Sequence, residues 1–237
     1  MKGLIVERQA DLSRLYPSWE KKTIWKFFET TANRFPNREF VVTEDGERYT
    51  YSQAKNKVLA IAQSLLSIGV RPGDHVAIQM ENSAKLVFVA LAVAAVRAVK
   101  VPVNISLGQR EVSYIVNQSD ASYFFAGCPV NLTGVETHLR QIVVLPSIEC
   151  EADIPIVAWE DFLAAGGDGE LPDSDGAQYA DEISDIVYTS GSTSAPKGVP
   201  LTHDMLMRNV FASCFDRGVE IGRRMFVPLP LFQLHDS

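Results

Sequence analysis

The sequence predicts an α/β fold with a mainly parallel β-sheet covered by helices. Short apolar segments of strand length, such as residues 75–80 and 121–126, alternate with longer segments whose apolar residues recur at helical spacing. This alternation is typical of βαβ units, in which each helix connects two parallel strands and covers one face of the sheet.

The first predicted elements are a helix and a small β-hairpin. Apolar residues recur at helical spacing from Thr23 to Phe35, and Pro36 ends the pattern. Residues 39–43 and 47–51 then flank a short turn that contains a glycine, which predicts two antiparallel strands near the N-terminus.

The predicted βα alternation follows. Ser52 is the expected N-cap of the next helix and Gly69 its expected stop. The later elements are expected at residues 75–80 (strand), 84–96 (helix), 98–103 (strand), 109–118 (helix), and 121–126 and 141–145 (strands), with a weaker helix between the last two.

Residues 164–181 differ in composition from the rest of the chain. Glycine and aspartate are abundant there and large apolar residues are scarce, which predicts an exposed connection. It is either a subdomain boundary or a surface loop inside one fold.

Composition excludes several classes of function. The net charge is −7, with 29 acidic and 22 basic residues, which argues against a nucleic-acid partner. The three cysteines show no metal-ligand spacing, so no metal site is predicted and the thiols are expected to be reduced. Arg97 and Lys100 interrupt the longest apolar run, so no transmembrane segment is expected. The first residues do not form a secretory signal, and we expect a cytoplasmic protein.

The residues with the clearest chemistry follow the apolar segment 183–188. They form a glycine- and hydroxyl-rich loop that contains one lysine, and Thr202 is placed to cap a helix after it. Gly191 and Gly198 permit close approach, main-chain N–H groups of such loops bind anions, and the lysine adds positive charge. The candidate phosphate ligands are Thr189, Ser190, Gly191, Ser192, Thr193 and Lys197.

A Walker A loop is the first alternative for such a composition. That motif requires Gly-Lys-Ser/Thr, whereas Lys197 lies between Pro196 and Gly198. A GTPase or P-loop kinase is therefore disfavoured.

The segment Tyr188-Thr189-Ser190-Gly191-Ser192-Thr193-Ser194-Ala195-Pro196-Lys197-Gly198-Val199 resembles the phosphate-loop signature of the adenylate-forming (AMP-binding) superfamily. Shorter segments over most of the chain also resemble this family, and the overall pattern is most similar to acyl-CoA synthetases. These segments are 30–36, 40–42, 49–51, 69–78 and 101–104.

The resemblance implies an ATP-dependent reaction. A carboxylate substrate would attack the α-phosphate of ATP to give an acyl-adenylate and pyrophosphate, and the thiol of CoA would then displace AMP. ATP, Mg²⁺ and CoA are the implied cofactors, and the six candidate ligands would contact the β- and γ-phosphates. A carboxylate is already ionised near neutral pH, so no general base is assigned, and the catalytic residues are unknown.

The chain departs from the family pattern in three places. Ser194 stands where a second glycine is usual. Gln233 occupies the position of a usual histidine and His235 follows two residues later, so a substrate-site role for either is doubtful. The family's later motifs and its C-terminal domain have no counterpart here, so residues 1–237 are expected to be the N-terminal part of the large domain and to be inactive alone.

Another class of function stays open: a non-catalytic binding or scaffold protein that retains half of an adenylating fold. An exposed apolar patch, or formation of a homo-oligomer through it, would favour this alternative. The particular carboxylic acid is not indicated by these residues, and neither is the acceptor thiol.

Overall fold

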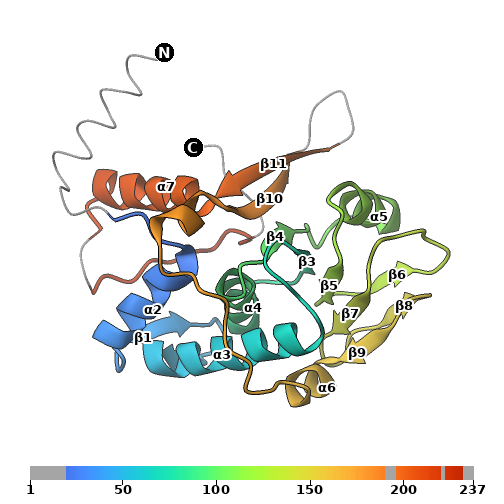
Figure 1. The fold of residues 1–237 in the computed structure, drawn as a ribbon, viewed down its shortest axis with the longest axis horizontal. Coiled ribbons are helices and arrows are strands. Elements are labelled where there is room, and N and C mark those ends of the chain that lie inside the picture. The colour runs from blue at the N-terminus through green and yellow to red at the C-terminus, as the bar shows by residue number, and fades with distance from the viewer. Residues whose placement is uncertain (1–19, 190–195, 220–221, 232–237) are drawn as a thin grey trace, which may run out of the picture.

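A seven-stranded sheet forms the centre of the computed structural model, which describes residues 20–189, 196–219 and 222–231 (Figure 1). Its strands are β3 (His75–Gln79), β4 (Val99–Pro102), β5 (Tyr123–Ala126), β7 (Gln141–Val144), β9 (Ile156–Ala158), β10 (Ile183–Thr189) and β11 (Lys197–Thr202). Their order across the sheet is β11-β10-β4-β3-β5-β7-β9. All neighbouring pairs from β10 to β9 are parallel, and β11 alone among these strands runs antiparallel to its neighbour. The predicted mainly parallel sheet is confirmed.

Helices cover both faces of this sheet. They are α2 (Ile24–Arg34), α3 (Tyr51–Ser67), α4 (Ala84–Ala95), α5 (Gln109–Gln118), α6 (Trp159–Ala164) and α7 (His203–Asp216), with a 3₁₀ turn η1 (Ala177–Asp181) before β10. Buried residues of α2, α3, α4 and α6 form a first apolar core with one face of the sheet. Residues of α5 form a second core with the other face.

The strands supply both cores because their side chains alternate between faces. In β5, Tyr123 and Phe125 belong to the first core, whereas Phe124 and Ala126 belong to the second. The side chains of this strand are therefore apolar throughout, as expected of a parallel strand that is covered on both sides.

The predicted N-terminal hairpin is also confirmed. Strands β1 (Glu39–Val42) and β2 (Arg48–Thr50) pair antiparallel between α2 and α3. The predicted N-cap of α3 is wrong by two residues. Thr50, not Ser52, caps the helix, because the Thr50 hydroxyl accepts from Gln53 N while the Gln53 side chain accepts from Thr50 N.

The weaker helix predicted between residues 126 and 141 is absent. The described chain there contains β6 (Val130–Leu132), which pairs with β8 (Cys150–Ala152) in a small parallel sheet. Val130 and Leu132 are buried and Asn131 is exposed, so the period of this segment is two rather than helical.

Residues 165–176 connect α6 to η1 without helix or strand, and β10 then joins the sheet that contains β3 and β4. A subdomain boundary at 164–181 stays a prediction. Within the described part of the chain, no helix has the length and apolar character needed to cross a membrane.

Candidate functional site

The predicted phosphate-binding loop lies at the tip of a β-hairpin. Strand β10 pairs antiparallel with β11 up to Thr189 and Lys197, which are opposite each other where the two strands meet the loop. The sequence predicts a strand, a loop and then a helix. The structure differs, because the residues after the loop first form β11 and α7 begins at His203. Thr202 caps α7 as predicted, its hydroxyl accepting from Met205 N at 3.2 Å.

The candidate residues fall into two groups. Thr189 and Lys197 are described and both side chains are exposed. Ser190, Gly191, Ser192 and Thr193 lie outside the described residues, as do Gln233 and His235. The structure thus places Thr189 and Lys197 on either side of residues 190–195, which we call the loop.

The loop follows the carboxyl end of a parallel strand. Asp185 of β10 pairs with Lys100 of β4 in parallel register, so Thr189 lies at the edge of the sheet where β3 and β4 also end. Ligands of open α/β sheets bind in the crevice outside this edge.

Lys197 is available to an anionic ligand. Its side chain is exposed and makes no hydrogen bond or ion pair with any residue that the structure describes. A lysine side chain carries three donors on a flexible stem and is a common point-charge ligand of phosphate.

Helix α5 contacts the hairpin on both sides of the loop. The hydroxyl of Tyr188 donates to Gln118 Oε1, and the hydroxyl of Tyr114 donates to the carbonyl oxygen of Pro196 at 3.1 Å. Burial raises the pKa of Tyr188, so this side chain is a neutral donor at physiological pH. Neither Tyr114 nor Gln118 belongs to a motif that indicates a role in the sequence.

Gly198 allows neighbouring side chains to approach the main chain of β11 closely. A Cβ atom there would lie 3.1 Å from Tyr188 Cζ and 2.9 Å from Ile186 Cγ2. The glycine therefore leaves room for both the Ile186 methyl group and the Tyr188 ring, which lie against the main chain of β11.

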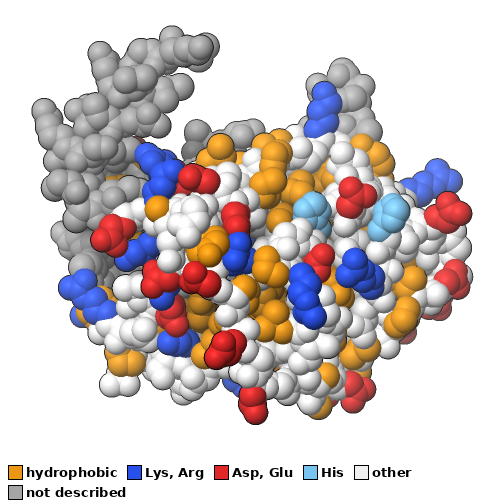
Figure 2. Space-filling model, viewed as in Figure 1, with side chains coloured by type: hydrophobic (Ala, Val, Ile, Leu, Met, Phe, Trp, Pro, Cys, Tyr) orange, Lys and Arg blue, Asp and Glu red, His pale blue; other side chains and the backbone are white. Residues whose placement is uncertain are grey.

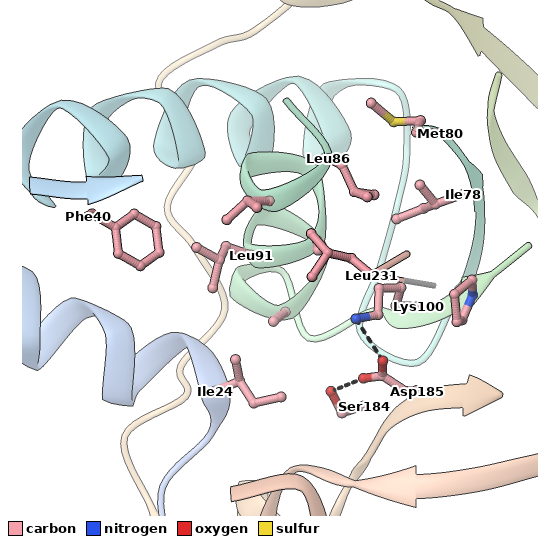
Figure 3. A pocket seen from close by; sticks show the side chains of 14 residues that line it. Ile24, Phe40, Ile78, Met80, Leu86, Leu91, Lys100, Ser184, Asp185 and Leu231 are labelled. Atoms are coloured by element: carbon pink, nitrogen blue, oxygen red, sulfur yellow. Dashed lines mark hydrogen bonds and ion pairs between the residues drawn. The ribbon is translucent and has the colours of Figure 1, made fainter. Parts of the chain in front are cut away.

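A separate cavity of about 260 Å³ is lined by Ile78 and Leu86 of the first core (Figure 3), so it lies on the opposite face of the sheet from α5. Apolar side chains of α4, together with Ile24, Phe40 and Leu231, form most of its wall. The polar part of the wall is an ion pair, with Lys100 Nζ 2.8 Å from Asp185 Oδ1. Ser184 Oγ donates to Asp185 Oδ2 at 2.7 Å.

The chain from Met225 to Leu231 is largely exposed, and Leu231 at its end lines this cavity. Asn82 holds its end through two main-chain hydrogen bonds of 2.9 Å, donating to Leu229 O and accepting from Leu231 N. The exposed large apolar side chains of this segment, which we call the apolar strip, are Met225, Phe226, Val227, Leu229 and Leu231. Phe226 is 87% exposed.

A model of the family described as "AMP-binding enzyme" matches residues 28–235, which include the whole hairpin. The chain belongs to the AMP-binding enzyme family.

Curated relatives of this chain include acyl-CoA ligases and also bacitracin synthase 1 of Bacillus licheniformis, which is 29% identical over 83% of this chain and 3% of the relative. The medium-chain fatty-acid–CoA ligase of Escherichia coli is 26% identical over 90% of this chain and 38% of the relative. The long-chain-fatty-acid–CoA ligase FadD13 of Mycobacterium tuberculosis is 31% identical over 79% of this chain and 36% of the relative. The chain thus corresponds to the N-terminal part of these enzymes and spans about two fifths of their length.

A solved structure shows the same fold. The long-chain-fatty-acid-CoA ligase FadD1 of Archaeoglobus fulgidus superposes with a TM-score of 0.75, at 21% identity, over 91% of this chain and 43% of that one. The predicted resemblance to the AMP-binding family and the predicted fold class are both confirmed.

The described residues offer no metal-binding cluster. No group of three or more His, Cys, Asp or Glu in residues 20–189, 196–219 and 222–231 is placed to hold an ion, so no side chain is assigned to Mg²⁺.

On the face shown in Figure 2, basic and acidic side chains are interspersed.

Proposed function

We propose that this chain forms the N-terminal part of an acyl-CoA ligase that activates a carboxylic acid with ATP, and that its β10–β11 loop binds the β- and γ-phosphates. The proposal rests on one observation above the others. The glycine- and hydroxyl-rich signature connects strand ends at the carboxyl edge of the sheet, and one of these ends carries the exposed cation of Lys197.

In this proposal Lys197 and the loop neutralise the charge of the leaving pyrophosphate. The thiol of CoA would then displace AMP from the acyl-adenylate. Lys197 would donate to a phosphate oxygen, and Thr189, Ser190, Ser192 and Thr193 would add hydroxyl donors, while Gly191 would allow the main chain to approach. Such an arrangement acts by holding the polyanion in line with the carboxylate and by stabilising charge that develops in the transition state.

ATP–pyrophosphate exchange tests the reaction. The gene product, read to its natural stop codon, would be supplied with ATP, Mg²⁺, labelled pyrophosphate and each of a panel of aliphatic and aromatic carboxylates. We expect exchange that depends on at least one of these acids. Absence of exchange with every acid, from a folded protein, would contradict the proposal.

A second candidate function, that of a non-catalytic scaffold that associates with itself, is supported by a different observation. The apolar strip exposes five large apolar side chains in one short segment, which favours association with a second copy of the chain. Light scattering of the 237-residue chain would show a dimer that Phe226→Ser converts to monomer. A monomeric wild-type chain would exclude this function.

A further inference from the structure

Two side chains of α5 hold the two sides of the loop. Tyr114 donates to Pro196 O at 3.1 Å, directly after the loop, and Gln118 accepts from Tyr188, which is next to Thr189 before the loop. We propose that Tyr114 and Gln118 are positioning residues that fix the two strand ends on either side of residues 190–195 for nucleotide binding. This inference rests on the proposed function.

Their spacing explains how one helix reaches both sides. Tyr114 and Gln118 are four residues apart, so they lie side by side on one face of α5. Both side chains are exposed, whereas Val112, Ile115 and Val116 are buried in the second core. The face that meets the hairpin is therefore distinct from the face that anchors the helix to the sheet.

The helix itself is firmly held. At its start Gly108 N donates to Glu111 Oε2 at 3.0 Å, and near its end Asn117 Nδ2 donates to Glu136 O at 2.7 Å. Contacts with α5 therefore tie the hairpin to the body of the fold.

Gly198 of the hairpin allows the contact between Tyr188 and α5. Because position 198 has no side chain, the Tyr188 ring can lie against β11 and direct its hydroxyl towards α5. A binding loop that is held in place before its ligand arrives loses less conformational entropy on binding. Release of either contact should therefore weaken nucleotide binding without removing a group that touches the nucleotide.

Hydrogen exchange on the 237-residue chain tests the positioning role without a nucleotide. Tyr114→Phe and Gln118→Leu each remove one hydrogen bond and nearly conserve shape, whereas Gln118→Glu keeps the acceptor oxygen. We expect the first two variants to speed amide exchange at residues 187–199 by roughly 2- to 10-fold, and Gln118→Glu to restore the wild-type rate. Tyr179→Phe is the matched control, because it removes a tyrosine hydrogen bond to Asp173 near the other end of β10.

ATP affinity of the gene product gives the second readout. Tyr114→Phe and Gln118→Leu should each raise the Kd for ATP by roughly 2- to 10-fold, with Tyr179→Phe unchanged. Unchanged exchange at 187–199 in both variants would overturn the positioning role. The positioning role would also be overturned if Tyr114→Phe and Gln118→Leu both bound ATP with the affinity of the wild type. A third outcome separates the two proposals. If the wild-type protein does not bind ATP but both variants speed amide exchange at residues 187–199, the proposed function is contradicted, whereas the role of Tyr114 and Gln118 in holding the hairpin is supported.

Discussion

The ring of Tyr188 lies against Gly198 on the neighbouring strand, and the two residues are paired in the β10–β11 ladder. A methyl group at position 198 would lie 3.2 Å from the Tyr188 hydroxyl oxygen as well as 3.1 Å from Cζ. The glycine thus decides where the ring can lie, and the ring connects the hairpin to α5.

Gly198→Ala should therefore destabilise the protein. Displacing the Tyr188 ring and the Ile186 methyl group is an overpacking effect that costs about 1–3 kcal/mol, measured as the free energy of unfolding in urea. Gly169→Ala is the control, because Gly169 lies outside helices and strands and a Cβ there would meet nothing nearer than 3.8 Å. Equal effects of the two substitutions would show that the contact with Tyr188 has no special importance.

The ion pair between Lys100 and Asp185 yields a second prediction. The Asp185 side chain is only 7% exposed, so Lys100→Met would leave a buried carboxylate without its cation. We expect a loss of about 3 kcal/mol in the free energy of unfolding, largely recovered in the double variant Lys100→Met/Asp185→Leu. A single variant as stable as the double one would contradict this account.

His203 predicts how stability depends on pH. This residue is 1% exposed, its Nδ1 accepts from Ile24 N at 3.3 Å, and burial lowers its pKa from 6.5 to about 4. Between these values the unfolded chain binds a proton that the folded chain does not, so stability falls as the pH falls from 6.5 towards 4. The contribution of this group to the decline is about 3 kcal/mol.

A series of urea unfolding curves between pH 4 and pH 7 would measure this decline. His203→Asn keeps an acceptor for Ile24 N but cannot titrate, so its stability should depend less steeply on pH. Parallel curves for the two proteins would show that His203 is not responsible.

The start of α3 provides a prediction with a matched control two residues away. Thr50→Ala removes the capping hydroxyl and should lower the free energy of unfolding by about 1 kcal/mol. Ser52→Ala should have little effect, because Ser52 is exposed within the first turn and does not cap the helix. The reverse order, measured by thermal or urea unfolding, would favour the cap expected from sequence.

These elements show what local sequence can predict. Helices α2 and α5 were predictable because each has a clear apolar period. Helix α4 and strands β3, β4, β5 and β7 were predictable because each is an apolar segment of helix or strand length. The cap of α3 was misplaced because Thr50 and Ser52 both have capping side chains, and the choice depends on the partner, Gln53. Strands β6, β8 and β9 have three residues each, too few for a period to emerge.

Strand β11 and the contacts of α5 could not be predicted for different reasons. Gly198 and Pro200 are unusual in strands, and Pro200 is tolerated here because β11 is an edge strand. The partners of Tyr114 and Gln118 are 82 and 70 residues away in sequence, so only the folded topology brings them together. The spacing of four residues on the exposed face of α5 was the available signal. The loop itself was predicted from its composition, and the binding role of its residues stays a prediction.

The most direct test of the central claim is the affinity of the gene product for ATP in the presence of Mg²⁺, measured by calorimetry for wild type, Lys197→Ala and Lys57→Ala. Lys57 is an exposed lysine of α3 and controls for the loss of one positive charge. If the loop binds the terminal phosphates, Lys197→Ala should raise the Kd by roughly 10-fold or more, the loss expected for one charge-assisted hydrogen bond, and Lys57→Ala should leave it unchanged. Equal ATP affinity of the wild type and Lys197→Ala would contradict the account.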